Sequence, residues 1–236
     1  MWSAGSDVFD VYLGLAVGGL VRGNERAIWQ PHATPDAGLG VLFEQARQQA
    51  RRPVRVWLSG ALARPFLCGP VQGLKRWSEV TAVAQAMAPD ATGLAAPCEV
   101  QVEAWPSPYA ALAVAIDPIV QQAIEAAARE HGLRLQSLRP WWAVAFNQVL
   151  AAAKGARLVA VADSDALTLL GGDDERVHTA SAYVPRPSDE QAGQSVARLA
   201  LTAGVDAEQV VRVRLARGEP EAGQGVPFGM VREEGA

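Results

Sequence analysis

Glycines near the start of the chain form the first pattern with the chemistry of a binding site. Gly14, Gly18 and Gly19 lie in an apolar stretch, and glycine lets a backbone approach a phosphate closely. No lysine-serine or lysine-threonine pair follows them, so this segment is not a P-loop. A tight hairpin turn in a buried sheet explains the same glycines, and we favour that interpretation over a phosphate cradle.

Oxygen-bearing side chains form the second pattern, centred on position 164. Asp163, Ser164 and Asp165 follow an apolar segment, and carboxylate and hydroxyl oxygens are ligands that Mg²⁺ prefers. Asp and Ser are also common in turns, because their side chains bond to nearby backbone amides, and we favour the turn interpretation. If a nucleotide binds, the predicted contacts are Gly14, Gly18, Gly19, Asp163, Ser164 and Asp165.

The other chemistry-bearing side chains do not group into a site. His32, His131 and His178 are far apart, and none stands at ligand spacing from a cysteine or a carboxylate. Cys68 and Cys98 lack a C-x-x-C partner and are expected to pack as small apolar residues. No G-x-S-x-G motif marks a nucleophilic serine. We therefore predict no catalytic residue and no metal site.

Composition limits the class of protein. The chain has 236 residues, of which 50% are apolar, enough for a sizeable core. A net charge of −4 argues against a nucleic-acid partner. The apolar run over residues 11–21 is too short to cross a bilayer, and Asp7 and Asp10 stand where a signal peptide has basic residues. We expect a cytoplasmic protein without direct membrane insertion.

The first half of the chain reads as a hairpin, a helix and a strand, followed by a segment rich in proline and glycine. Apolar periodicity and punctuation by Gly and Pro define these elements. The expected strands cover residues 11–21, 27–29, 54–58 and 99–105, and the expected helices cover residues 39–51 and 78–87, the second with Ser78 as its N-cap.

The second half has clearer boundaries. Asp117 and Pro118 are an N-cap and a first helical residue, and Ser188 is a second N-cap. Three consecutive strands, a helix and a strand are expected after residue 156. The expected strands cover residues 109–116, 133–138, 157–162, 166–170, 175–183 and 210–215, the expected helices cover residues 118–131, 141–154 and 188–203, and residues 217–236 are expected to be a disordered tail.

Two adjacent tryptophans open one of these helices. Trp141 and Trp142 differ by about 100° around the helix axis, so both cannot face the same core. We expect one of them either at an exposed contact or in a groove between lobes.

This order of elements resembles the actin-like ATPase superfamily. The family's first hairpin reads G-[IL]-D-[IL]-G, and residues 14–22 are similar, with Ala16 in place of the metal-handling aspartate. Residues 158–170 resemble the second hairpin, with acidic residues at its turn. Residues 117–154 resemble the middle of PilM-type pilus assembly proteins and of the cytoplasmic domain of the secretion protein GspL.

The resemblance implies an α/β protein with two actin-like, ribonuclease-H-like lobes, whose mixed sheets are flanked by helices. We expect a degenerate N-terminal lobe over residues 1–108, a C-terminal lobe over residues 109–216 and the tail over residues 217–236.

The resemblance also implies a non-catalytic platform for a type IV pilus or type II secretion-like assembly. Its partner would be the cytoplasmic tail of an inner-membrane assembly protein, and a homodimer is left open. The alternative is a phosphotransferase or a regulatory module that binds ATP and Mg²⁺. The phosphotransferase requires Asp10, Asp163 and Asp165 to converge on one cleft.

Overall fold

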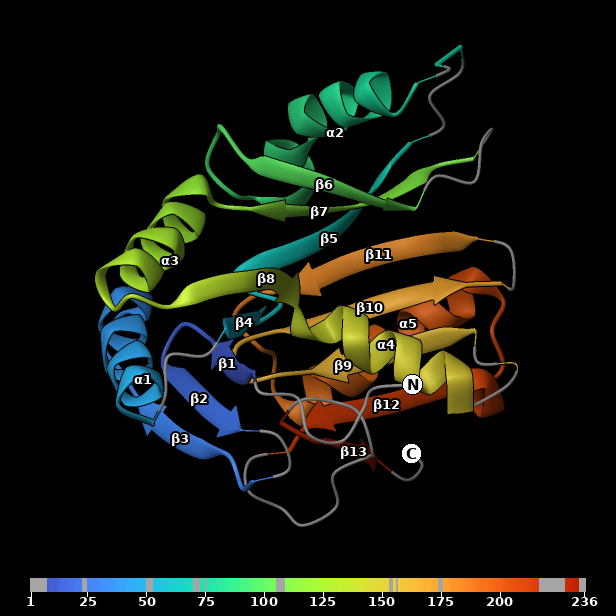
Figure 1. Ribbon diagram of the computed structural model, residues 1–236. Coiled ribbons are helices and arrows are strands. Elements are labelled where there is room, and N and C mark those ends of the chain that lie inside the picture. The colour runs from blue at the N-terminus through green and yellow to red at the C-terminus, as the bar shows by residue number, and fades with distance from the viewer. Residues whose placement is uncertain are drawn as a thin grey trace.

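The computed structural model describes residues 8–22, 25–49, 53–69, 73–74, 76–104, 109–152, 155, 157–173, 176–216 and 228–233. These residues form two five-stranded sheets and one three-stranded sheet, with helices against them (Figure 1). The predicted fold class, α/β with mixed sheets flanked by helices, is confirmed.

The first lobe is built on a five-stranded sheet with the order β3-β2-β1-β4-β8. Its first three strands form an antiparallel meander, and β4 and β8 then add in parallel beside β1. Helix α1 packs on this sheet, and α3 packs beside α1 (Figure 1). The elements are β1 (Phe9–Leu13), β2 (Val17–Arg22), β3 (Ile28–Pro31), α1 (Pro35–Gln49), β4 (Pro53–Leu58), α3 (Pro118–Glu130) and β8 (Arg134–Pro140).

The second lobe repeats this plan. Its sheet has the order β11-β10-β9-β12-β13, again a meander followed by a helix and a parallel strand. The repeat ends at the fifth strand, because β13 runs antiparallel to β12. The elements are β9 (Leu158–Ala162), β10 (Leu167–Gly172), β11 (Val177–Tyr183), α5 (Asp189–Ala203), the short 3₁₀ helix Ala207–Gln209, β12 (Val210–Leu215) and β13 (Met230–Glu233).

A smaller antiparallel sheet interrupts the first lobe between β4 and α3. Its order is β5-β7-β6, and α2 covers one face with Val80, Ala84 and Ala88. Helix α2 begins after Arg76 rather than after Ser78, and it is longer than the periodicity predicted. The elements are β5 (Ala63–Cys68), α2 (Trp77–Thr92), β6 (Glu99–Ala104) and β7 (Ala111–Ile116).

Two of the three predicted helix caps, Asp117 and Ser188, are confirmed. The Asp117 side chain accepts a hydrogen bond from the backbone N–H of Ile119, with Pro118 in the first turn. Ser188 and Gln191 form a reciprocal capping box at the start of α5. These caps satisfy N–H groups that have no partner inside the helix.

The strand pairings move two predicted boundaries. We expected the first lobe to end at residue 108, but β7 pairs with β5 and β6, and β8 pairs with β4. By sheet pairing the first lobe therefore extends through Pro140. The tail was expected to be disordered over residues 217–236, yet Met230–Glu233 forms β13; residues 217–227 and 234–236 lie outside the described residues.

Of the two alternatives for the paired tryptophans, the exposed contact is wrong, and the place between the lobes agrees with the structure. Trp141 and Trp142 are both buried, with 0% and 1% exposure. They open α4 (Trp141–Ala152), which contacts β8 of the first lobe and β9 of the second. Because both lobes cover this helix, two adjacent positions find apolar surroundings on different sides. The indole N–H of Trp142 donates to the carbonyl of Ala63 at 2.8 Å.

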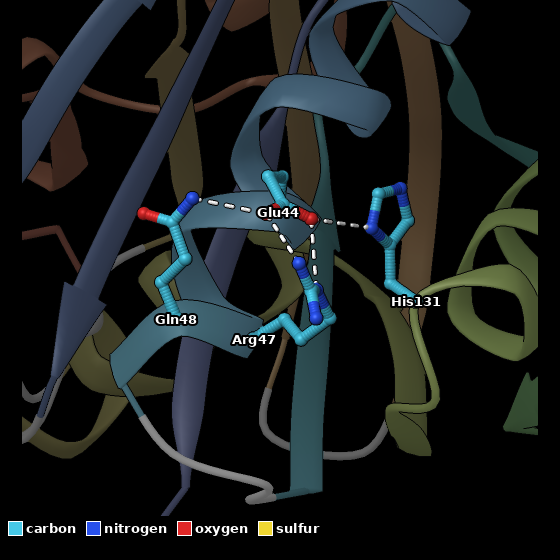
Figure 2. A network of polar contacts seen from close by, with 4 residues as sticks. All are labelled: Glu44, Arg47, Gln48 and His131. Carbon is cyan, nitrogen blue, oxygen red and sulfur yellow. Dashed lines mark hydrogen bonds and ion pairs between the residues drawn. The ribbon is translucent and has the colours of Figure 1, made fainter.

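A polar cluster joins α1 to the C-terminal end of α3 (Figure 2). The Glu44 carboxylate accepts hydrogen bonds from Arg47 at 2.6 and 2.8 Å and from Gln48 at 2.9 Å. His131 Nδ1 lies 3.3 Å from the same carboxylate. Hydrogen bonds from Arg47 and then Gln48 lower the pKa of Glu44 to about 2.

This cluster predicts a difference in acid stability between the wild type and Glu44→Gln. The folded-state pKa of Glu44 lies below its ordinary value of 4.5, so its contribution is present above that value and disappears as the pH falls toward 2. In urea unfolding at pH 7, the free energy of unfolding should be larger for the wild type than for Glu44→Gln. At pH 2.5 the unfolding curves of the two proteins should lie closer together. Glu130→Gln, on the exposed end of α3, is the control. An equal gap between wild type and Glu44→Gln at both pH values would contradict the prediction.

Within the described ranges, no helix is both long enough and apolar enough to span a lipid bilayer.

Candidate functional site

The turns of the two hairpins meet between the lobes. The first turn joins β1 to β2 and is closed by a hydrogen bond from Gly14 N–H to the Val17 carbonyl. The second turn joins β9 to β10 and begins at Asp163. The backbone N–H of Leu15 in the first turn donates to Oδ2 of Asp165 in the second, at 2.7 Å. The two turns are therefore in direct contact, with a carboxylate bound to a backbone amide.

A chain of hydroxyl groups runs beside this contact. The Tyr12 hydroxyl lies 2.8 Å from Ser164 Oγ, which lies 2.7 Å from Asp165 Oδ2. An ionised carboxylate only accepts hydrogen bonds, so Ser164 must donate to Asp165 and Tyr12 must donate to Ser164. Burial, with the charges of Asp163 and Asp165, raises the pKa of Tyr12 and keeps its hydroxyl protonated. Every oxygen in this chain therefore has a defined role.

Asp163 organises the second turn. It is 1% exposed, and its Oδ1 accepts hydrogen bonds from the backbone N–H groups of Asp165 at 2.9 Å and Ala166 at 3.0 Å. Its Oδ2 accepts a third from Gly60 N–H at 2.5 Å. Burial raises the pKa of Asp163 to about 6, although the three N–H donors favour the carboxylate.

A third loop completes the junction, at the end of β4. The Ser59 N–H donates to the Leu13 carbonyl at 2.9 Å, which fixes this loop to the first hairpin. Gly60 then reaches Asp163 in the second lobe. A Cβ at Gly60 would lie 2.5 Å from Thr168 Oγ1, so a residue without a side chain is needed there.

Not all of the predicted nucleotide contacts come together. Gly14, Asp163, Ser164 and Asp165 meet at this junction. Gly18 and Gly19 lie inside β2 and not in the turn, where they make room for the core: a Cβ at Gly18 would lie 2.6 Å from Leu42, and one at Gly19 would lie 2.8 Å from Trp29.

The alignment of the first hairpin with the family pattern needs correction. Ala16, which the resemblance placed at the aspartate position, lies in the exposed turn. The side chain that reaches from β1 to the second hairpin is Tyr12. The register is wrong because pattern matching followed the glycines, and Gly18 belongs to the strand.

Asp10 is not drawn into the junction. Both of its oxygens are used within β1 and β4: Arg55 donates two hydrogen bonds, at 2.8 and 2.7 Å, and the Trp57 indole donates one at 2.7 Å. The three carboxylates that the phosphotransferase alternative requires are therefore separated, because Asp10 is bonded within the sheet while Asp163 and Asp165 lie at the junction. Across the described ranges, no three His, Cys, Asp or Glu side chains are grouped to hold a metal ion.

Sequence reasoning missed Tyr12 and Gly60. Tyr12 stands in an apolar run, and a buried tyrosine hydroxyl usually finds a hydrogen-bond partner, which is the signal for its role. Gly60 follows an alternating strand, where a glycine often marks a close approach of another backbone or ligand. Neither signal identifies the partner.

Substitutions at Gly14 and Gly40 should have opposite effects on stability, because the space around the two glycines differs. A Cβ at Gly14 would lie 2.3 Å from Asp165 Oδ2 and 2.5 Å from Ser164 Oγ, so Gly14→Ala must separate the two turns and should cost about 1–3 kcal/mol. Gly40 lies inside α1 with open space around its Cβ position, so Gly40→Ala should stabilise by about 0.5–1 kcal/mol. Denaturant unfolding of both variants tests this pair, and equal signs would refute it.

Comparison with known proteins gives a result at the level of structure only. No protein-family model matches the sequence, and no curated protein matches it. A Bacteroides thetaiotaomicron protein with an actin-like ATPase fold and unknown function has a TM-score of 0.54 at 9% identity, covering 86% of this chain and 79% of its own. A chain of the PilM–PilN type IV pilus biogenesis complex also has a TM-score of 0.54, at 14% identity, covering 86% and 68%.

The cytoplasmic domain of EpsL, an inner membrane component of the type II secretion system of Vibrio cholerae, matches with a TM-score of 0.47 at 14% identity, covering 75% of this chain and 71% of that one. Identities this low relate folds and not functions. The repeated strand order and the two matches with TM-scores above 0.5 agree, and they confirm the fold predicted from the resemblance. This protein has the actin-like ATPase fold.

Proposed function

We propose that the protein is a non-catalytic, cytoplasmic scaffold of a type IV pilus or type II secretion-like assembly, and that it binds the cytoplasmic tail of an inner-membrane partner. The observation that carries the non-catalytic part is the hydrogen bond from Leu15 N–H to Asp165 Oδ2. An N–H group in the turn of a first hairpin is the donor that a phosphate would need. In this chain its acceptor is a carboxylate of the other lobe.

The space around this bond supports the same proposal. The Cβ position of Gly14 is already within 2.5 Å of two side-chain oxygens, so a phosphate has no room there without displacement of Asp165. An anion would also meet the negative charges of Asp163 and Asp165. Phosphoryl transfer requires metal ions and donors to neutralise the phosphates, whereas these carboxylates already use backbone N–H groups within the chain.

The assembly role is supported by the fold and by the sequence resemblance. The PilM–PilN complex, whose chain shares this fold, is a type IV pilus biogenesis complex. Residues 117–154 resemble PilM-type proteins and GspL in the order of helix, strand and proline-started helix. We therefore propose an inner-membrane protein partner and a cytoplasmic location, with a homodimer as a further possibility to test.

The alternative is a nucleotide-binding module of the same superfamily, with ATP and Mg²⁺ held by Gly14, Asp163, Ser164 and Asp165. One observation favours it: the two acidic side chains do lie against the first hairpin turn. It requires Asp165 to rotate away from Leu15 when nucleotide enters.

Isothermal titration with Mg-ATP separates the two proposals. We expect no binding up to millimolar nucleotide for the wild type. Asp165→Ala releases the Leu15 N–H and is the companion variant, while Asp90→Ala on the exposed end of α2 is the control. Micromolar binding by the wild type would overturn the non-catalytic scaffold.

The partner is tested separately, with the whole chain. Synthetic peptides of the cytoplasmic tails of inner-membrane pilus and secretion proteins from the same organism are titrated by fluorescence anisotropy. One saturable partner among them is expected, and analytical ultracentrifugation of the chain alone tests for a homodimer. If no tail binds at 100 µM, on the order of the weakest specific peptide affinities, the assembly role fails even when ATP does not bind.

A further inference from the structure

The segment Phe228–Glu233 touches both lobes, although it follows the second lobe in sequence. Its last four residues form β13, which pairs with β12 from Leu215↔Met230 to Arg212↔Glu233. A hydrogen bond from Ala216 N–H to the Gly229 carbonyl, at 3.3 Å, continues this pairing. Residues 229–233 are thereby attached to the second lobe.

Phe228, at the start of the segment, packs on the first lobe. Its ring centroid lies 5.9 Å from that of Tyr12 in β1 and 5.3 Å from that of Trp29 in β3. The Tyr12 and Trp29 rings are themselves 5.6 Å apart, so the three form one aromatic cluster. Phe228 is only 7% exposed, and a Cβ at Gly19 would lie 3.1 Å from its ring. Gly19 in β2 therefore provides the space into which the ring fits.

The backbone at Phe228 and Gly229 is in an uncommon conformation, so the Phe228 side chain and the strand that follows it point in different directions. Phe228 has a φ of 69° and Gly229 a φ of 73°. The left-handed region is unfavourable for a residue with a side chain, so Phe228 adopts it only because its surroundings hold it there. The sharp turn places the ring on the first lobe. The strand that follows, β13, lies beside β12 of the second lobe (Figure 1).

The cluster also connects to the junction of the two hairpins. The Tyr12 ring packs against Phe228 and Trp29, and its hydroxyl is hydrogen-bonded to Ser164 of the second lobe. The Leu15–Asp165 hydrogen bond beside it is open to solvent, where a single hydrogen bond contributes little net stability. Aromatic packing is the larger contribution on this side of the junction.

We propose that Phe228–Glu233 is an intramolecular latch that fixes the angle between the two lobes. β13 anchors the latch to the second lobe, and the Phe228 ring locks into the site formed by Tyr12, Trp29 and Gly19 on the first. When the ring leaves this site, the lobes keep their own folds and stay joined by the hydrogen bonds of the hairpin junction, but the angle between them varies over a wider range. The latch is independent of the scaffold function and holds for a nucleotide-binding module as well.

Pulsed electron paramagnetic resonance on the full chain tests the latch. Spin labels are placed on Ala37→Cys in α1 and Ala197→Cys in α5, both exposed, in a Cys68→Ala, Cys98→Ala background. With Phe228 present, one narrow distribution of inter-lobe distances is expected. Phe228→Ala should widen this distribution at least about twofold, because truncation removes the side chain that fills the aromatic site.

Two further variants keep the test decisive. Leu201→Ala removes an apolar side chain that is 83% exposed, and it should leave the distribution unchanged. Phe228→Leu keeps apolar bulk and should give an intermediate width; it decides the test if circular dichroism shows that Phe228→Ala does not fold. The latch is overturned if the folded Phe228 variants give the same narrow distribution as the wild type.

Discussion

Replacing Asp163 with alanine should destabilise the protein by at least about 3 kcal/mol. The buried carboxylate accepts hydrogen bonds from the backbone N–H groups of Gly60, Asp165 and Ala166. Asp163→Ala leaves these three donors without their acceptor, and each unsatisfied buried donor costs about 1–3 kcal/mol. The effect is large because one side chain closes the second turn and also holds the loop after β4. Urea unfolding at pH 7 measures it.

One variant compares the hydrogen bonds of Asp163 with its charge, and a second serves as the control. Asp163→Asn keeps one acceptor oxygen, so it should cost less than Asp163→Ala, while its amide N–H₂ faces at least one backbone donor. Asp90→Ala, an exposed carboxylate on α2, should change stability by less than about 0.5 kcal/mol. If Asp163→Ala unfolds at the same urea concentration as the Asp90 control, the proposed role of Asp163 is wrong.

Removing the carboxylate of Asp10 should cost about 3–5 kcal/mol. Asp10 is 5% exposed and binds Arg55 through both oxygens, and the parallel register places these two residues side by side in β1 and β4. Asp10→Ala leaves the guanidinium of Arg55, whose side chain is 14% exposed, without its carboxylate. It also removes the acceptor of the buried Trp57 indole N–H. Thermal and urea unfolding measure the loss.

A double variant distinguishes the destabilisation caused by breaking the Asp10–Arg55 ion pair from the stability that the intact pair contributes. Asp10→Leu with Arg55→Met replaces the ion pair by apolar groups of similar size and should recover most of the stability, to within about 2 kcal/mol of wild type. The remaining deficit reflects the indole N–H of Trp57. If the double variant were as unstable as Asp10→Ala, the loss would come from packing and not from the broken Asp10–Arg55 ion pair.

Local rules predicted much of the fold. Asp117, Pro118 and Ser188 mark helix starts because a cap and its N–H groups are neighbours in sequence. The meander, helix and strand of the second lobe were predicted for the same reason, since alternation and turn residues act over short distances. The order of these elements was enough to suggest the actin-like fold that the structure confirms.

Errors arose where distant segments decide the outcome. The boundary at residue 108 was wrong because β8 joins β4 across an inserted sheet, which no local pattern records. Trp141 and Trp142 are both buried because α4 lies between two lobes. Local patterns predict a disordered tail over Met230–Glu233, which forms a strand only through its pairing with β12, a segment distant in sequence.

By itself, the sequence determined most element types, two helix caps, the fold class and the six residues to consider at a nucleotide site. It missed β5 and read β1 and β2 as one strand. Only the tertiary structure decided which of the six residues meet. It placed Gly18 and Gly19 in a strand, Tyr12 opposite Ser164, and Asp165 on the backbone of Leu15. The physical reason is that secondary structure depends on hydrogen bonds and periodicity between near neighbours, whereas this junction depends on how two separately folded sheets pack against each other.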